Sequence, residues 1–282
     1  MRFVATCVLW LLTTAALAVA LPTAWAQRTL VDVDGYAALA QRAAADPQLR
    51  SAVAAELSTQ ATALIDERGY DVDPALVRDV AADYTAGPAF GPQFAQANRI
   101  AHGWMFTGAD APAGPDRWVV DLAPMLNDPA FAQLLEDHHV QVPTAVTVPV
   151  TVTPPAGLRP GRLRPLATWG RWLQLGVAAV AGVCAVLTLA AARRRGMALA
   201  SLGVAALLVG AAGYAGIEVG RGHLNDTLNA TAGDIREIAD VMVDYAEASL
   251  HHWLNLTLAA GGVVVVFGMF VAMLGGLARF GR

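Results

Sequence analysis

The sequence predicts a helical membrane protein, with four transmembrane helices and a mainly helical extracytoplasmic domain that includes a small β element. Of its 282 residues, 56% are hydrophobic and only 15% are charged, a more apolar balance than in soluble globular proteins. Four stretches of roughly 20 residues carry no charge, which is the length a helix needs to cross a bilayer. All 23 acidic residues fall within residues 32–137 and 218–247, so charge is sorted along the chain.

The first apolar stretch, Phe3–Leu21, follows Arg2 and is 19 residues long. Shortly after it, Ala24-Trp25-Ala26 matches the small-x-small pattern of signal-peptide cleavage. Two interpretations of residues 1–26 therefore remain open: a signal anchor that stays in the membrane, or a signal peptide cleaved after Ala26. Both place the next segment outside the cytoplasm.

Residues 27–169 are expected to form the extracytoplasmic domain. Three of its helices begin with the same pair, at Asp46-Pro47, Asp73-Pro74 and Asp128-Pro129. The aspartate accepts hydrogen bonds from free backbone N–H groups, and proline at the next position has no N–H to lose. The predicted helices are 34–45, 47–68, 74–85, 92–106 and 129–138. Residues 109–116 are expected to form a loop, and 117–122 and 146–153 two strands.

Residues 170–217 are predicted to form a transmembrane helical hairpin. Its arms, Leu173–Ala192 and Gly196–Ile217, have 20 and 22 residues, and each would be roughly 30 Å long as a helix. The turn between them is Arg193, Arg194 and Arg195, and one arginine at mid-bilayer costs about 2.5–3.5 kcal/mol. We therefore expect this turn to lie in the cytoplasm.

Residues 218–252 are predicted to be a second extracytoplasmic segment, which is acidic. Asp234 and Glu237 are spaced as in a capping box, and apolar residues follow at helical intervals. An amphipathic helix is therefore expected to run directly into the last span. Residues 253–282 hold that span, Leu254–Leu277, and a short cytoplasmic tail.

The distribution of arginine supports this orientation. The segments placed in the cytoplasm carry six arginines and no carboxylate, in agreement with the positive-inside rule. One group lies on the other side, and we interpret it as facing the outer headgroup layer, near anionic lipid. The alternative is an inverted orientation. This group consists of Arg159, Arg162, Arg164 and Arg171.

Glycine recurs every seven residues in the third and fourth spans. Seven-residue spacing keeps these positions on one face of a helix, and small residues let two backbones approach closely. We expect the two faces to meet, within the chain or across a dimer, although glycine is also simply frequent in spans. The residues are Gly196, Gly203, Gly210, Gly261, Gly268 and Gly275.

Two groups of polar residues are candidate sites. Asn98, Arg99 and His102 lie near Trp104 on one predicted helix, where they form either a binding site or a set of helix-capping and interdomain hydrogen bonds. A second group follows one helical stripe, which could hold a divalent cation or simply be a solvated polar face. That stripe consists of Asp240, Asp244, Glu247 and His251.

The order of these parts and three short motifs resemble those of a known group of proteins. The motifs are Asn98-Arg99-Ile100-Ala101-His102, Phe106-Thr107-Gly108 and Val120-Asp121-Leu122. The chain resembles a broad group of uncharacterised actinobacterial multi-pass integral membrane proteins with a large extracytoplasmic helical domain. The resemblance implies a location in the cell envelope and no catalytic residues.

The sequence contains no nucleophile elbow, phosphate loop, zinc-protease helix or dinucleotide fingerprint. We expect a non-enzymatic integral membrane protein of the bacterial cell envelope whose extracytoplasmic domain binds a protein or lipid partner, for example as an accessory subunit of an envelope complex. Expected partners are membrane lipids and an envelope protein or a second copy, without cofactor or nucleic acid. The alternatives are a transporter or channel component, and an envelope enzyme that uses Asn98, His102 or the 240–251 stripe.

Overall fold

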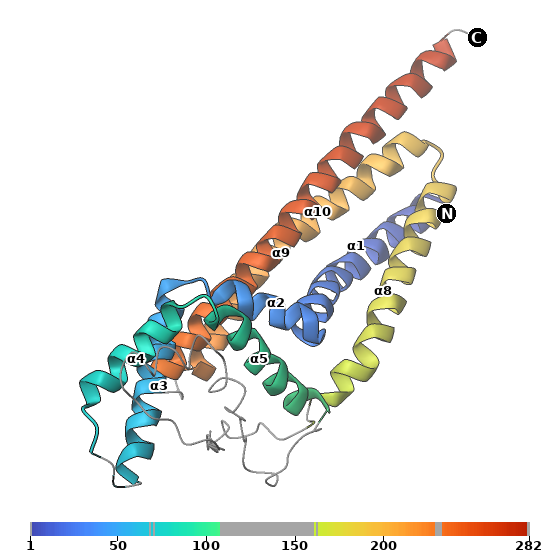
Figure 1. Ribbon diagram of the computed structural model, residues 1–282. Coiled ribbons are helices and arrows are strands. Elements are labelled where there is room, and N and C mark those ends of the chain that lie inside the picture. The colour runs from blue at the N-terminus through green and yellow to red at the C-terminus, as the bar shows by residue number, and fades with distance from the viewer. Residues whose placement is uncertain are drawn as a thin grey trace. The chain divides into compact units, whose positions relative to one another are not determined.

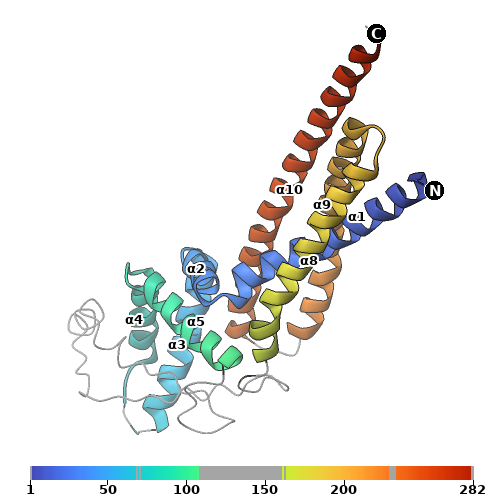
Figure 2. The ribbon, with the colours of Figure 1, turned by 90° about the vertical axis from the view of Figure 1, so that its right-hand side faces the viewer.

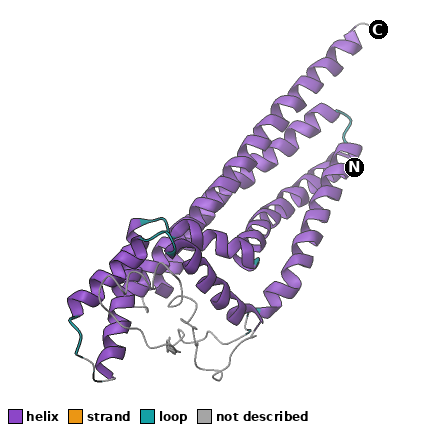
Figure 3. Ribbon diagram, viewed as in Figure 1, coloured by secondary structure: helices purple, strands orange, loops and turns teal. Residues whose placement is uncertain are grey.

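The described part of the chain consists of helices joined by short turns. The computed structural model describes residues 2–67, 69, 71–107, 161, 163–228 and 233–280, and these contain no strand (Figure 3). The elements in chain order are α1 (Arg2–Ala26), the π-helix η1 (Gln27–Val31), α2 (Val33–Ala43), α3 (Pro47–Glu67), α4 (Pro74–Ala86), α5 (Phe90–Thr107), α8 (Arg164–Ala191), α9 (Arg195–Leu228) and α10 (Asp234–Phe280).

Part of the predicted domain lies outside the described residues. This applies to the predicted helix 129–138, to the loop 109–116, and to the strands 117–122 and 146–153 that were to form the small β element.

Four of the described helices are long and apolar enough to cross a membrane, in agreement with the sequence. They are the stretches Val4–Val31, Arg164–Ala191, Arg195–His223 and Asp234–Leu274.

The helices do not stop where the apolar runs stop. The first continues from α1 through η1 to Val31, α8 already begins at Arg164, and α9 continues past Ile217 to Leu228. A helix satisfies its backbone hydrogen bonds internally in water as in lipid, so the edge of an apolar run does not by itself end it. The sequence located the apolar cores of these helices and underestimated their lengths.

The chain divides into two compact units. We call one the span unit, which consists of Met1–Arg28, Thr168–Asn225 and Glu247–Arg282. The other is the domain unit, which consists of Thr29–Ala167 and Asp226–Ala246. Helix α10 contributes residues to both units, because it continues unbroken through the boundary at residues 246–247.

In the domain unit, aspartates begin the helices as the sequence predicts. The Oδ1 atom of Asp46 accepts a hydrogen bond from Gln48 N at 2.8 Å, and Asp73 Oδ1 accepts one from Ala75 N at 2.8 Å. These two bonds satisfy N–H groups that the first helical turn leaves without a partner. Helix α3 packs against α4, and α2 packs against α5 (Figures 1 and 2).

The core of the domain unit is built around Phe90, at the start of α5. Its ring makes an edge contact with Tyr84 of α4 at 5.8 Å and a tilted contact with Phe94 at 5.5 Å. Helix α3 contributes Leu49 and Val53 to this core. The first part of α10 completes it, with Val241 buried and Ile238, Met242 and Tyr245 packed against the cluster.

In the span unit, α9 and α10 pack along their glycines. A Cβ atom added at Gly203 would lie 2.7 Å from the carbonyl oxygen of Gly261, and one at Gly196 would lie 2.7 Å from the carbonyl oxygen of Gly268. Real Cβ atoms essentially never come this close to another heavy atom. Only glycine therefore permits this backbone separation.

The same seam continues toward Gly210, where an added Cβ would lie 2.8 Å from Leu258 Cγ. Gly275 belongs to the last part of α10, for which side-chain surroundings are not described. The contacts of the other five glycines of the heptad pattern join α9 and α10 within one chain.

We expect Gly203→Ala to lower the thermal stability of the purified protein in detergent, because its Cβ would push α9 and α10 apart. Overpacking of this kind costs about 1–3 kcal/mol. Gly262→Ala, on the partner helix α10, is the matched control, since nothing lies within 4 Å of its added Cβ. Equal midpoints of thermal unfolding for the two variants would contradict this account of the seam.

Candidate functional site

The buried His102 of α5 contacts the C-terminal end of the first long helix. Its Nε2 atom lies 3.0 Å from the carbonyl oxygen of Leu30, near the C-terminal end of η1. The last carbonyl groups of a helix have no partner within it. The imidazole supplies one donor there, which requires the tautomer protonated at Nε2.

Aromatic rings surround His102. Its ring stacks on that of Phe106, with centroids 4.2 Å apart, and lies 5.4 Å from that of Tyr36 on α2. Burial lowers the pKa of the His102 imidazole, although the Leu30 and Val31 carbonyls and the charge of Asp32 act in the opposite direction. Burial likewise raises the pKa of the Tyr36 hydroxyl. Both side chains are therefore neutral near pH 7.

The neighbours of His102 are also engaged in contacts within the protein. Arg99 Nη1 forms an ion pair with Asp34 Oδ1 of α2 at 2.5 Å. The Asn98 side chain donates to the carbonyl oxygen of Phe94, one turn earlier in α5, at 2.9 Å. Arg99 and His102 thus join α5 to α2 and to the end of η1, whereas the bond of Asn98 stays within α5.

Trp104 differs from these residues. It is buried, and its indole Nε1 has no hydrogen-bond partner in the described part of the chain. An unsatisfied buried donor costs about 1–3 kcal/mol, so this N–H is available to an acceptor that reaches it. The backbone carbonyl of the same residue accepts a bond from Gly161 N at 3.1 Å.

The residues of the acidic stripe of α10 each contact a different partner. Asp240 pairs with Arg236 at 3.6 Å, and Glu247 pairs with Arg221 of α9 at 3.1 Å. The ring of His251 stacks on Tyr214 of α9, with centroids 5.0 Å apart. Asp244 also takes part in a polar or electrostatic interaction. Within the described residues, no group of three or more histidine, cysteine or acidic side chains could hold a metal ion.

Polar contacts between the helices of the span unit were not foreseen from the sequence. Tyr214 donates from its hydroxyl to Asn255 Oδ1 of α10 at 2.7 Å, and Trp10 Nε1 of α1 donates to the carbonyl oxygen of Ser201 at 2.7 Å. The partners in each pair lie far apart in the sequence. The available signal was the presence of polar residues within apolar runs, which does not identify the partner.

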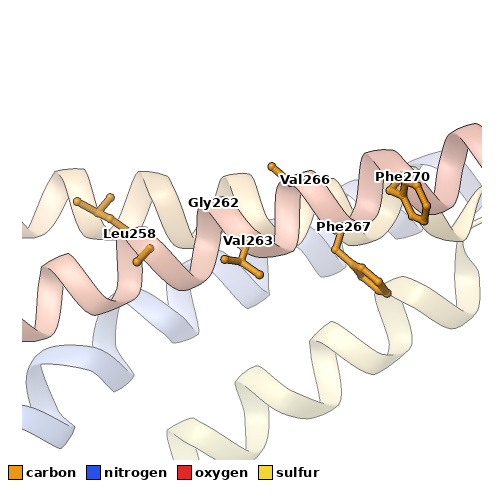
Figure 4. Close-up of a pocket in the computed structure, with 7 residues that line it drawn as sticks. Leu258, Gly262, Val263, Val266, Phe267 and Phe270 are labelled. Carbon is orange, nitrogen blue, oxygen red and sulfur yellow. The ribbon is translucent and has the colours of Figure 1, made fainter.

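The exposed surface of α10 carries an apolar groove of about 590 Å³. Its seven lining residues all belong to this helix, as Figure 4 shows, and Phe267 and Phe270 form one end of it. The groove is shallow, and Gly262 is one of the residues that line it. Such a surface can accept an acyl chain or another apolar helix.

Comparisons with protein-family models, with curated proteins and with solved structures found no match.

We expect the stability of the protein to fall as the pH is lowered below about 6.5, the usual pKa of histidine. His102 has a lowered pKa in the folded state, so the unfolded chain binds more protons in this range, and acid favours unfolding. One such group contributes a slope of at most about 1.4 kcal/mol per pH unit. Thermal unfolding between pH 8 and pH 5.5 measures the effect.

His102→Gln is the matched variant, because its amide can donate to the Leu30 carbonyl and does not titrate. Its unfolding midpoint should be lower than that of the wild type at pH 8 and should depend less on pH. An unchanged pH dependence in this variant would assign the effect to other groups.

Proposed function

We propose that this chain is a non-enzymatic integral membrane protein of the bacterial cell envelope, whose domain unit lies outside the cytoplasm and binds a protein or lipid partner. An accessory subunit of an envelope complex is the role that we favour. The turn at Arg193–Arg195 and the C-terminus would lie in the cytoplasm.

The main support for this proposal is that α10 belongs to both the domain unit and the span unit. Its first part packs into the core of the domain unit through Val241, and its later part packs on α9 through Gly261 and Gly268. A displacement of the domain unit would therefore act on α10, the helix that would also cross the membrane. This connection suits a protein that holds a binding domain at a membrane surface.

The engagement of the candidate side chains supports the same proposal. His102, Arg99 and Asn98 contact other parts of the protein through their polar atoms. An enzymatic role for His102 would require it to exchange the Leu30 carbonyl for a substrate. The channel alternative requires a polar path between the spans, whereas the groove in Figure 4 is lined by apolar side chains of one helix.

Thiol labelling tests the proposed orientation. The chain has two cysteines, Cys7 and Cys184, which are replaced by alanine. Ser51→Cys, at an exposed position of α3, should react with a membrane-impermeant thiol reagent in intact cells. Ala192→Cys, directly before the arginine turn, should react only after the cells are opened. The reverse pattern would show the inverted orientation.

Site-specific photo-crosslinking in cells tests the proposed partner. A photoreactive residue at the exposed positions Val72 or Ile100 of the domain unit should give one shared envelope protein or lipid product. The control position is Val183, which is exposed on α8 in the span unit and should not give that product. Recovery of the chain alone from both domain positions would contradict the proposal.

A further inference from the structure

Aromatic residues lie near one end of the uncharged run on each of the four candidate spans. Trp25 lies just after the run of α1, and Trp169 and Trp172 precede that of α8. Tyr214 lies near the end of the run in α9, and Trp253 directly precedes the run of α10. All five residues belong to the span unit. Tryptophan and tyrosine at such positions favour the layer between lipid tails and water.

Contacts between α1 and α10 place the aromatic residues of these two helices at one level of the span unit. Trp25 donates from Nε1 to Ser249 Oγ of α10 at 3.4 Å, one turn before Trp253. The guanidinium carbon of Arg28, one turn further along from α1, lies 5.5 Å from the ring centroid of Trp253. The two tryptophans are therefore at nearly the same height along their helices.

Helices α8 and α9 meet the others at this same level. The side chain of Gln27 lies against the backbone of Gly170, which stands between the two tryptophans of α8. The ring of Tyr214 stacks on that of His251, with centroids 5.0 Å apart, and its hydroxyl donates to Asn255 Oδ1 at 2.7 Å. Both of these partners lie two positions from the tryptophan of α10, so all four helices present aromatic rings at one height.

The tryptophans of α8 are the most exposed members of this group. Trp169 and Trp172 are 70% and 71% exposed. An indole ring has a large apolar body and one polar N–H, so neither water nor lipid tails alone suit it. The headgroup layer of a bilayer offers both environments, and exposed rings at this level are favoured there.

Arginine lies at or beside the opposite end of each of the four helices. From the aromatic level, each helix extends roughly 29–39 Å before the chain reaches that arginine, at 1.5 Å per residue. A hydrocarbon core is about 30 Å thick, and the long arginine side chain can extend past its edge. One slab of that thickness therefore fits between the two ends of all four spans. The arginines are Arg2, Arg193, Arg195 and Arg279.

We propose that the five aromatic residues form a girdle in the headgroup layer of one leaflet, from which the four spans extend across the bilayer. The girdle rests on the membrane location proposed above and defines the depth of each span. It places the apolar groove of α10, residues 258–270, inside the hydrocarbon core, roughly 8–25 Å from the girdle. Lipid acyl chains, rather than the partner of the domain unit, then cover that groove.

The girdle predicts a common depth for matched positions in the four spans. About ten positions from the aromatic level, or about 15 Å, each helix should cross the middle of the bilayer. Each helix has an exposed residue there, which a probe can replace without disturbing the packing. The four residues are Ala15, Val180, Val204 and Val263.

Site-directed spin labelling of the full chain, reconstituted in bilayers of phosphatidylglycerol and phosphatidylcholine, measures these depths. Both native cysteines are replaced by alanine, and a single cysteine at each of the four positions holds the nitroxide. All four labels should collide most with oxygen, which is concentrated in lipid, and least with a water-soluble nickel complex. Their depths should agree within about one helical turn, or about 5 Å.

Leu173→Cys and Leu256→Cys are the matched shallow positions, 56% and 57% exposed, on the same helices as Val180 and Val263. Their labels should lie about 10 Å closer to the girdle than the deep labels. Val219→Cys on α9, which lies beyond Tyr214 and is 73% exposed, should collide strongly with the nickel complex.

A difference of more than about two turns among the deep labels, or strong nickel collision at one of them, would overturn the girdle. Nickel collision at all four would overturn the membrane location as well. The absence of an envelope partner, or an inverted orientation, leaves these depths unchanged, so failure of the proposed function is distinguishable. If a variant does not fold, Val183→Cys or Val266→Cys, at exposed positions one turn further along α8 or α10, replaces it.

Discussion

Helix α10 continues without a break for 47 residues. Both units depend on this continuity. Its first turns are amphipathic and place Val241 in the core of the domain unit. Its later turns are apolar and place Gly261 and Gly268 against α9. A break between these parts would expose free backbone N–H and C=O groups near the membrane, where each unsatisfied group is costly. Continuing the helix avoids that cost and makes one element serve two cores.

The two cores are held by different forces. In the domain unit, burial of Phe90, Leu49 and their neighbours removes apolar surface from water. In lipid this driving force between helices is absent, since acyl chains are as apolar as the side chains. Close packing at Gly203 and Gly261 replaces it, because the short separation of the backbones increases dispersion contacts along the seam.

Polar side chains serve mainly as connections between helices. His102 donates to the end of η1, and Tyr214 joins α9 to α10 through Asn255. Each bond satisfies a group at a junction where a helix end or a span would otherwise leave it without a partner. Arg28 is different, because its guanidinium lies over the ring of Trp253.

By itself, the sequence determined the helical class, the four apolar runs, the helix starts at Asp46 and Asp73, and the heptad spacing of glycine, because each is a local or periodic property of the chain. The tertiary structure decided which faces meet. Only there does His102 find the Leu30 carbonyl, which lies 72 positions earlier, and only there does the stripe at Asp240 and Glu247 separate into different ion pairs. Periodicity shows that a face exists, whereas its partner depends on contacts between segments distant in the sequence.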